Sequence, residues 1–218
     1  MKEASPSQMS LIISYLTLRK AVGILGTALP FMLSLGAWLL FQTGIQSSIS
    51  SYYHTGMRDV FVGTLFAIGV FLLSYKGYEP QDNWAGNLAS LFAIGVALFP
   101  TTPAKAGPNT WDWVGSLHLV FAALFFLTLI YFSLFLFTKT HPNKSQTNRK
   151  KQRNIVYKVC GYTMALCVLL IVIFFLLPHS LETRLNGLNL LYWLETVAIL
   201  AFGVSWLTKG EAILQDED

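Results

Sequence analysis

The chain has 218 residues, of which 54% are hydrophobic and 12% are charged, and its formal net charge is +4. This composition excludes an ordinary soluble domain, and the length fits one helical bundle without a separate soluble domain. The sequence contains no glycine-rich phosphate loop, nucleophile elbow or CxxC pair, which sets aside the catalytic motifs of soluble enzymes.

Long apolar stretches follow one another along the chain and are separated by short polar segments. A hydrocarbon core of about 30 Å requires about 20 helical residues. The sequence therefore predicts an all-α fold, a polytopic membrane protein built as a bundle of six transmembrane helices. These helices are expected over residues 21–42, 57–75, 83–99, 114–138, 156–177 and 188–208.

The segments outside the spans are assigned by their polarity. Residues 1–20 are predicted to form an N-terminal cytoplasmic or interfacial segment, residues 21–208 the transmembrane domain, and residues 209–218 an acidic cytoplasmic tail. Within the first segment, residues 8–18 are moderately apolar but too few for a further span, which favours an interfacial helix. The alternative is that the first membrane helix continues into the cytoplasm.

The distribution of cations predicts the orientation. Of the 15 Lys and Arg residues, 12 lie in or at the edge of the four segments that six alternating spans place on one side of the membrane. The other side keeps only Arg58, Lys105 and Arg184. Because cytoplasmic loops carry an excess of Lys and Arg, both termini are expected in the cytoplasm of a multi-pass cell-membrane protein. The same rule explains the basic residues 148–153, with contact to acidic headgroups as a further use, so no nucleic-acid partner is predicted.

Small residues at helical spacing predict close packing between helices, which in lipid depends on backbone approach. Ala85, Ala89, Ala93 and Ala97 form an i, i+4 ridge, which predicts that the third span is a buried central element. Gly63 and Ala67 are expected to form a shorter ridge of the same kind on the second span.

Two polar residues lie where the bilayer disfavours them. Glu195 lies about 10 Å below the outer end of the sixth span. There a carboxylate costs about 2.5 kcal/mol or more unless it is protonated, paired or hydrated, so a functional site is the first interpretation. The alternative is a neutral Glu195 bonded to a neighbouring helix. His118 reaches a similar depth in the parallel fourth span, so the two groups can meet, although a lone histidine is more often a satisfied packing group.

The segment 46–59 is the richest polar stretch and links the first two spans on the outer side. It carries His54, Arg58 and Asp59, and it can fold back over the mouth of the bundle. The alternative is an ordinary connector in which Arg58 snorkels towards the interface. With Tyr192 from the sixth span, the predicted pocket consists of His54, Arg58, Asp59, His118, Tyr192 and Glu195.

Three histidines, His54, His118 and His179, fall on the predicted outer side. Histidine together with carboxylate is acceptable zinc chemistry. No closely spaced ligand pair such as HxxxH or HExxH accompanies them. The first expectation is therefore no cofactor, with zinc as the alternative.

Short motifs give a first resemblance. The polar outer loop before the second span, Leu117-His118 with Ala122 and Tyr131, and the segment from Tyr192 to Glu195 resemble the six-helix DRAM-like family and its bacterial relatives. The resemblance would cover most of the chain. It implies a role in lipid or membrane homeostasis, without a catalytic residue to transfer.

A second resemblance is shorter. Ser50-x-x-x-His54-Thr55 is similar to the Ser/His element of the ceramidase and adiponectin-receptor type membrane hydrolases. That superfamily implies a seven-helix core, a further Asp and a late HxxxH pair. The late pair is absent here, so only Ser50, His54 and Asp59 could be transferred.

The sequence thus predicts a multi-pass protein whose extracytoplasmic polar pocket binds a lipid headgroup or small amphiphile. Arg58 would face an anionic group, and Glu195 with His118 would fix the polarity below it. The alternatives are an intramembrane metal-dependent lipid hydrolase and a proton-coupled small-solute transporter that titrates Glu195. Membrane lipids are the expected partners. Whether the chain is an enzyme, and whether it forms a homo-oligomer, is left open.

Overall fold

The computed structural model describes residues 6–77, 79–103, 112–140 and 146–215, and every regular element within them is a helix. For residues 6–14, 179, 183 and 186 the description is limited to the backbone. The elements are α1 (Pro6–Phe41), η1 (Ser50–His54), α2 (Arg58–Leu73), α3 (Pro80–Leu98), α4 (Trp113–Tyr131), η2 (Phe132–Leu136), α5 (Asn148–Phe175), α6 (His179–Asn186) and α7 (Leu190–Lys209).

Each predicted span coincides with one long helix, namely α1, α2, α3, α4 with η2, α5 and α7. Four segments of the described chain are long and apolar enough to cross a membrane: Tyr15–Phe41, Trp113–Leu136, Asn148–Phe175 and Leu190–Lys209. The helices α2 and α3 are not among these four segments. The α2 helix has only 16 residues, and α3 starts with a polar turn that includes Asp82.

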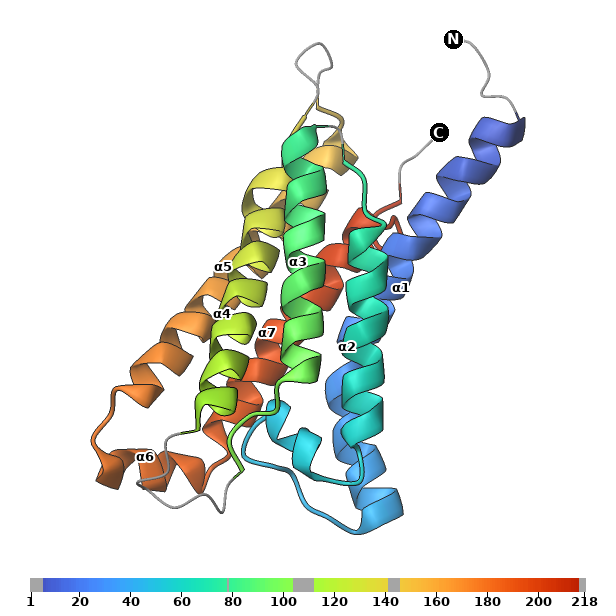
Figure 1. The fold of residues 1–218 in the computed structure, drawn as a ribbon. Helices are drawn as coiled ribbons and strands as arrows, with labels where there is room; N and C mark the ends of the chain where they lie inside the picture. Colours follow the sequence, from blue (N-terminus) through green and yellow to red (C-terminus); the bar gives the residue numbers. More distant parts are fainter. Residues whose placement is uncertain (1–5, 78, 104–111, 141–145, 216–218) are drawn as a thin grey trace.

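The six long helices form a ring in the order of the chain, and Figure 1 shows this ring from the side. Each helix contacts its neighbours in sequence, and the ring closes where α7 contacts both α5 and α1. The start of α1, the end of α7 and the α2–α3 and α4–α5 connections lie together at one end, called here the basic end. Its described cations include Arg19, Lys76, Lys139, Lys150, Arg153 and Lys209. The opposite end, with η1 and α6, is called the η1 end.

The helix α1 runs without interruption from Pro6 to Phe41, and its first turns extend past the other helices (Figure 1). The predicted separate interfacial helix over residues 8–18 is therefore wrong, and the alternative, a continued first helix, is found. One physical reason is the i, i+4 contact at the junction, where the guanidinium of Arg19 lies 4.4 Å from the centre of the Tyr15 ring. Such pairs stabilise an unbroken helix.

The ring closes through direct backbone approach between α1 and α7. A Cβ atom on Gly203 would lie 2.9 Å from the amide nitrogen of Thr27 and 3.0 Å from the carbonyl oxygen of Gly23. A Cβ atom on Gly23 would lie 2.7 Å from the amide nitrogen of Leu207. Glycine is therefore required on both sides of this contact, as expected for helices packed in lipid.

The two predicted small-residue ridges have different outcomes. All four alanines of the α3 ridge are buried, which confirms that this face packs against other helices. The opposite face is exposed, with Trp84 at 68%, so α3 is a member of the ring and the prediction of a buried central helix is wrong. The Gly63 ridge is also wrong, since a Cβ atom there would meet nothing within 4 Å.

Aromatic rings fill the basic-end half of the ring interior. The Trp206 ring lies between 5.2 and 5.5 Å from the centres of Tyr75, Phe132 and Phe137, and Tyr157 adds a contact to Phe137 at 5.3 Å. The π-helical turn η2 makes this possible. Its bond from the amide of Phe137 to the carbonyl of Phe132 (2.8 Å) shifts the register, so both rings point inward.

Candidate functional site

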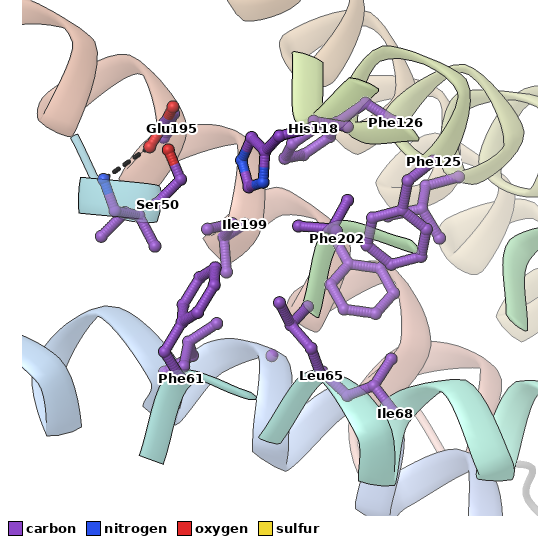
Figure 2. Close-up of a pocket in the computed structure, with 16 residues that line it drawn as sticks. Ser50, Phe61, Leu65, Ile68, His118, Phe125, Phe126, Glu195, Ile199 and Phe202 are labelled. Carbon is purple, nitrogen blue, oxygen red and sulfur yellow. Dashed lines mark hydrogen bonds between the residues drawn. The ribbon is translucent and has the colours of Figure 1, made fainter. Parts of the chain in front are cut away.

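A cavity lies inside the ring towards the η1 end, with about 70 Å³ of space open to the centre of a water-sized sphere. Helices α1, α2, α3, α4 and α7 contribute to its wall, together with the start of η1. The lining residues are Gly26, Leu29, Ile49, Ser50, Phe61, Leu65, Ile68, Val96, His118, Ala122, Phe125, Phe126, Leu129, Glu195, Ile199 and Phe202. Only Ser50, His118 and Glu195 among them carry polar side chains, and Figure 2 shows these three grouped on one side.

Glu195 connects α7 to the segment before η1. Its Oε2 atom accepts a hydrogen bond of 2.6 Å from the amide of Ile49, and the amide of Ser50 is a second backbone partner. The amide of Tyr192 donates to the carbonyl of Ser47 at 3.0 Å. Because the first amides of a helix lack internal partners, the Glu195 carboxylate acts as the N-terminal cap of η1 from another helix. Glu195 is thus a bonded, bracing residue that also lines the cavity.

His118 enters the cavity from α4 and is 1% exposed. Its Nδ1 atom donates to the carbonyl of Phe99 at 2.7 Å, and the backbone of Val96 is another partner. Both carbonyls belong to the C-terminal end of α3, where helical carbonyls lack internal partners. The imidazole of His118 is therefore held by α3, and it points across the cavity towards Ser50 and Glu195 (Figure 2). His118 from α4 and Glu195 from α7 therefore line the same cavity, each bonded to backbone groups of another segment.

Four of the six predicted pocket residues do not line this cavity. His54 is exposed, and its Nε2 atom bonds to the carbonyl of Thr101 at 2.6 Å. Arg58 is exposed and lies with its guanidinium 4.9 Å from the centre of the Tyr53 ring, and Asp59 is exposed in the first turn of α2. Tyr192 is buried outside the cavity, against the rings of Tyr52 and Trp193. At Arg58 the segment 46–59 is therefore an ordinary connector, with an exposed side chain that does not enter the cavity.

The histidine group proposed for zinc is not assembled in the described part of the chain. There, no three His, Cys, Asp or Glu residues are placed to hold a metal ion together. His54 and His118 each bond to a different backbone carbonyl. The side chain of His179, at the start of α6, lies outside the described residues.

The apolar wall of the cavity was not predicted. Phe61, Phe125 and Phe202 are ordinary members of apolar helices, and nothing in their spacing separates a cavity wall from a packed core. Ser50 entered the prediction only through the short motif that it shares with membrane hydrolases. An ionisable residue within an apolar span can be recognised in the sequence because burying its charge is costly, and Glu195 was predicted in this way. The apolar wall residues have no comparable sequence feature.

Asp112 fixes the start of α4 next to this region. Its carboxylate accepts a hydrogen bond of 3.1 Å from the amide of Val114. The amide of Gly115, followed by the hydroxyl of Thr102, lowers the pKa of Asp112 below its ordinary value, because both donors stabilise the charged carboxylate. Through Thr102, Asp112 therefore links the N-terminus of α4 to the residues that follow α3.

In comparisons with family models, with curated proteins and with solved structures, nothing matches this chain. The resemblances to DRAM-like proteins and to ceramidase-type hydrolases therefore remain predictions from short motifs.

Proposed function

We propose that the chain is a six-span membrane protein with both termini in the cytoplasm, and that its cavity binds an amphiphile near the outer face. The ring supports six spans, because α2 and α3 lie side by side between membrane-capable α1 and α4 and alternate in direction with them. The cations gathered at the basic end support the orientation, since such residues mark the cytoplasmic side.

The observation that carries the proposal is the unequal lining of the cavity. Ser50, His118 and Glu195 form a polar group towards the η1 end, while the deeper wall is apolar and includes Phe125 and Phe202. Pockets of this kind bind a ligand through apolar contact and orient it with a few polar groups. The head of an amphiphile would lie by Ser50 and Glu195, and its chain would extend towards the middle of the membrane.

The polar group also restricts the head of the ligand. The lining residues include one carboxylate and no Lys or Arg, and Arg58 lies elsewhere. A carboxylate accepts hydrogen bonds and repels another anion. The cavity thus favours a head that donates hydrogen bonds, such as a hydroxyl, an amide or an amine. The sequence-based expectation of an anionic head facing Arg58 has no support from this arrangement.

Neither alternative function gains a supporting observation. A metal-dependent lipid hydrolase requires a ligand group, which the described residues do not form. A proton-coupled transporter requires a route beyond Glu195, and the aromatic cluster around Trp206 occupies the basic-end half of the interior. The DRAM-like resemblance implies lipid biology, in agreement with an amphiphile as ligand.

Two adjacent alanines on α4 provide a matched test. Ala122 lines the cavity, whereas Ala123 is exposed on the outer surface of the ring. We expect a monoacylglycerol to raise the thermal unfolding temperature of the purified wild type and of Ala123→Phe, but not of Ala122→Phe, in which the new ring fills the space. Equal stabilisation of both variants would contradict binding in the cavity.

The head preference has a separate test. A fatty acid with the same chain length as the monoacylglycerol should stabilise the wild type less, because its carboxylate faces that of Glu195. In Glu195→Gln the charge is removed while a carbonyl acceptor for the amide of Ile49 remains. The difference between the two ligands should therefore shrink in this variant, and an unchanged difference would refute the role of Glu195.

A further inference from the structure

The hydrogen bonds of His118 decide what its imidazole offers to the cavity. A carbonyl oxygen can only accept, so the bond of 2.7 Å between Nδ1 and the carbonyl of Phe99 requires a proton on Nδ1. The side chain is 1% exposed and its bonding partners are uncharged, which favours the neutral imidazole. In that form the second nitrogen, Nε2, carries a lone pair. His118 therefore presents a hydrogen-bond acceptor to a ligand.

Glu195 presents a second acceptor, and it has no cation as a partner. Within the described part of the chain its carboxylate bonds to the amides of Ile49 and Ser50, and no ion pair joins it to Lys or Arg. A carboxylate has more acceptor positions than these two amides use. A charged side chain in a membrane span is costly unless it is paired. The described residues thus leave the counter-charge of Glu195 to a ligand.

Ser50 completes the polar group. Its hydroxyl oxygen lies 3.1 Å from that of Ser48, and a hydroxyl has lone pairs enough to accept a further hydrogen bond. Ser50, His118 and Glu195 lie on one side of the cavity, and the lining includes no Lys or Arg (Figure 2). All three side chains can accept a hydrogen bond, and the only charge among them is negative. The matching head has several donors and a positive charge.

We propose that the cavity selects an amphiphile whose head is a primary ammonium group. An ammonium has three N–H donors and one positive charge, as in the side chain of lysine. The charge pairs with the carboxylate of Glu195, while the other donors are directed to Nε2 of His118 and to the hydroxyl of Ser50. The apolar chain lies along Phe125 and Phe202. This inference rests on the proposed function and specifies the head group of its ligand.

The first experiment compares three dodecyl ligands on the purified full chain in a neutral detergent. Dodecylamine is protonated at neutral pH, as lysine is. Dodecyltrimethylammonium has the charge without an N–H donor, and dodecanol has a donor without the charge. We expect dodecylamine to raise the thermal unfolding temperature most and to bind at least about tenfold more tightly than either of the others. Dodecyltrimethylammonium or dodecanol binding as tightly as dodecylamine would overturn the proposal.

The two alanines on α4 exclude a general effect of a cationic amphiphile on the micelle. The response to dodecylamine should disappear in Ala122→Phe, which fills the cavity, and persist in Ala123→Phe, whose new ring lies outside it. An equal response in both variants would overturn the proposal.

The monoacylglycerol result distinguishes a failure of this inference from a failure of the proposed function. If the monoacylglycerol requires an open cavity but dodecylamine binds no better than dodecyltrimethylammonium, amphiphile binding stands and the ammonium selectivity is refuted. If neither the monoacylglycerol nor dodecylamine distinguishes Ala122→Phe from Ala123→Phe, the proposed function fails and the inference fails with it.

A substitution of His118 separates the acceptor from the charge. His118→Asn keeps an amide N–H for the carbonyl of Phe99 and removes Nε2 from the cavity. It should weaken dodecylamine binding about tenfold and leave dodecyltrimethylammonium within about twofold, because only the primary ammonium donates a hydrogen bond. The ratio of the two affinities is measured within one variant, so a general loss of stability does not change it. An unchanged ratio would refute the role of Nε2.

Two further variants complete the test. Glu195→Gln removes the charge and keeps an acceptor for the amide of Ile49, so both cationic ligands should lose affinity relative to dodecanol. Ser50→Ala removes the third acceptor and should lower the ratio of dodecylamine to dodecyltrimethylammonium affinity in the same direction as His118→Asn. It serves as the second variant if His118→Asn does not fold. Cationic ligands that keep their full advantage over dodecanol in Glu195→Gln would overturn the pairing with Glu195.

Discussion

The two halves of the ring interior are built from the same helices but are filled differently. On α7, Trp206 lies in the aromatic cluster of the basic-end half, whereas Phe202, one turn earlier, lines the cavity. Their rings are 6.2 Å apart. The boundary between a packed interior and an open one is therefore one helical turn wide. The cavity therefore ends where the large rings of the basic-end half begin.

The largest expected loss of stability follows from removing a buried ring in the basic-end half. Trp206→Ala should reduce the free energy of unfolding by about 3–5 kcal/mol, because a buried ring is lost among others. Phe61→Ala should cost less, since one side of Phe61 already faces empty space and has fewer contacts to lose. Chemical unfolding in detergent measures both. Similar losses in the two variants would mean that the halves are equally well packed.

A control for this comparison is Trp206→Phe. The Nε1 atom of Trp206 is buried and has no hydrogen-bond partner among the described residues. Phenylalanine keeps an aromatic ring and removes the unsatisfied donor, so the loss should be much smaller than with alanine. A loss as large as that of Trp206→Ala would show that Nε1 has a partner, such as a buried water.

The next effect concerns ring closure, on which both halves depend. Gly203→Ala should cost about 1–3 kcal/mol, because the new methyl group meets the backbone of Thr27. Gly63→Ala is the matched control. Its Cβ atom meets nothing within 4 Å, so it should be neutral or stabilise the helix by up to about 1 kcal/mol. Thermal unfolding of the two variants in parallel decides whether close approach of α1 and α7 is required.

A more local effect is expected at the cavity wall, which hydrogen bonds hold in place. Glu195→Ala leaves the amides of Ile49 and Ser50 without their acceptor, at a cost of about 1–3 kcal/mol. Hydrogen exchange at these amides should accelerate, while exchange around Trp206 stays unchanged. Glu195→Gln should show a weaker effect because it keeps an acceptor. Faster amide exchange around Trp206 as well would show that the basic-end half also depends on the hydrogen bonds of Glu195.

The smallest effect is a pH dependence at Asp112. Because its pKa is lowered in the folded chain, the carboxylate stabilises the fold above its unfolded pKa of about 3.9, and this contribution is lost as the pH falls through the lowered value. Asp112→Asn keeps a capping side chain and removes the charge. The wild type should be the more stable of the two at pH 7, and the difference should vanish at pH values well below 4. A constant difference would exclude the charge as its cause.

The helices and the costly polar residues could be predicted from sequence, whereas the shape of the site could not. Apolar runs of membrane length located the six long helices, and the cost of a buried carboxylate indicated Glu195. The loop residues His54 and Arg58 were misplaced because the conformation of their segment depends on Glu195, which is 146 residues away from its partner Ile49. Local patterns contain no information on such a contact.

The apolar residues present a different difficulty. In a soluble protein, the contrast between polar and apolar faces shows which side of a helix is buried. In a membrane helix both the lipid and the interior are apolar, so this contrast is lost. The exposed Gly63 and the buried Ala93 were therefore assigned to the same kind of ridge, although they face opposite environments.

The order of the ring has a consequence for how the protein is made. Synthesis delivers α1 first and α7 last, yet these two helices close the ring. The glycine face of α1 therefore has no helix partner until α7 has been synthesised. Glu195, which fixes the segment before η1, is part of the same late helix. A chain that stops before residue 190 would have five of the six long helices but neither a closed ring nor a cavity. The cavity is thus the last part of the ring to form during synthesis.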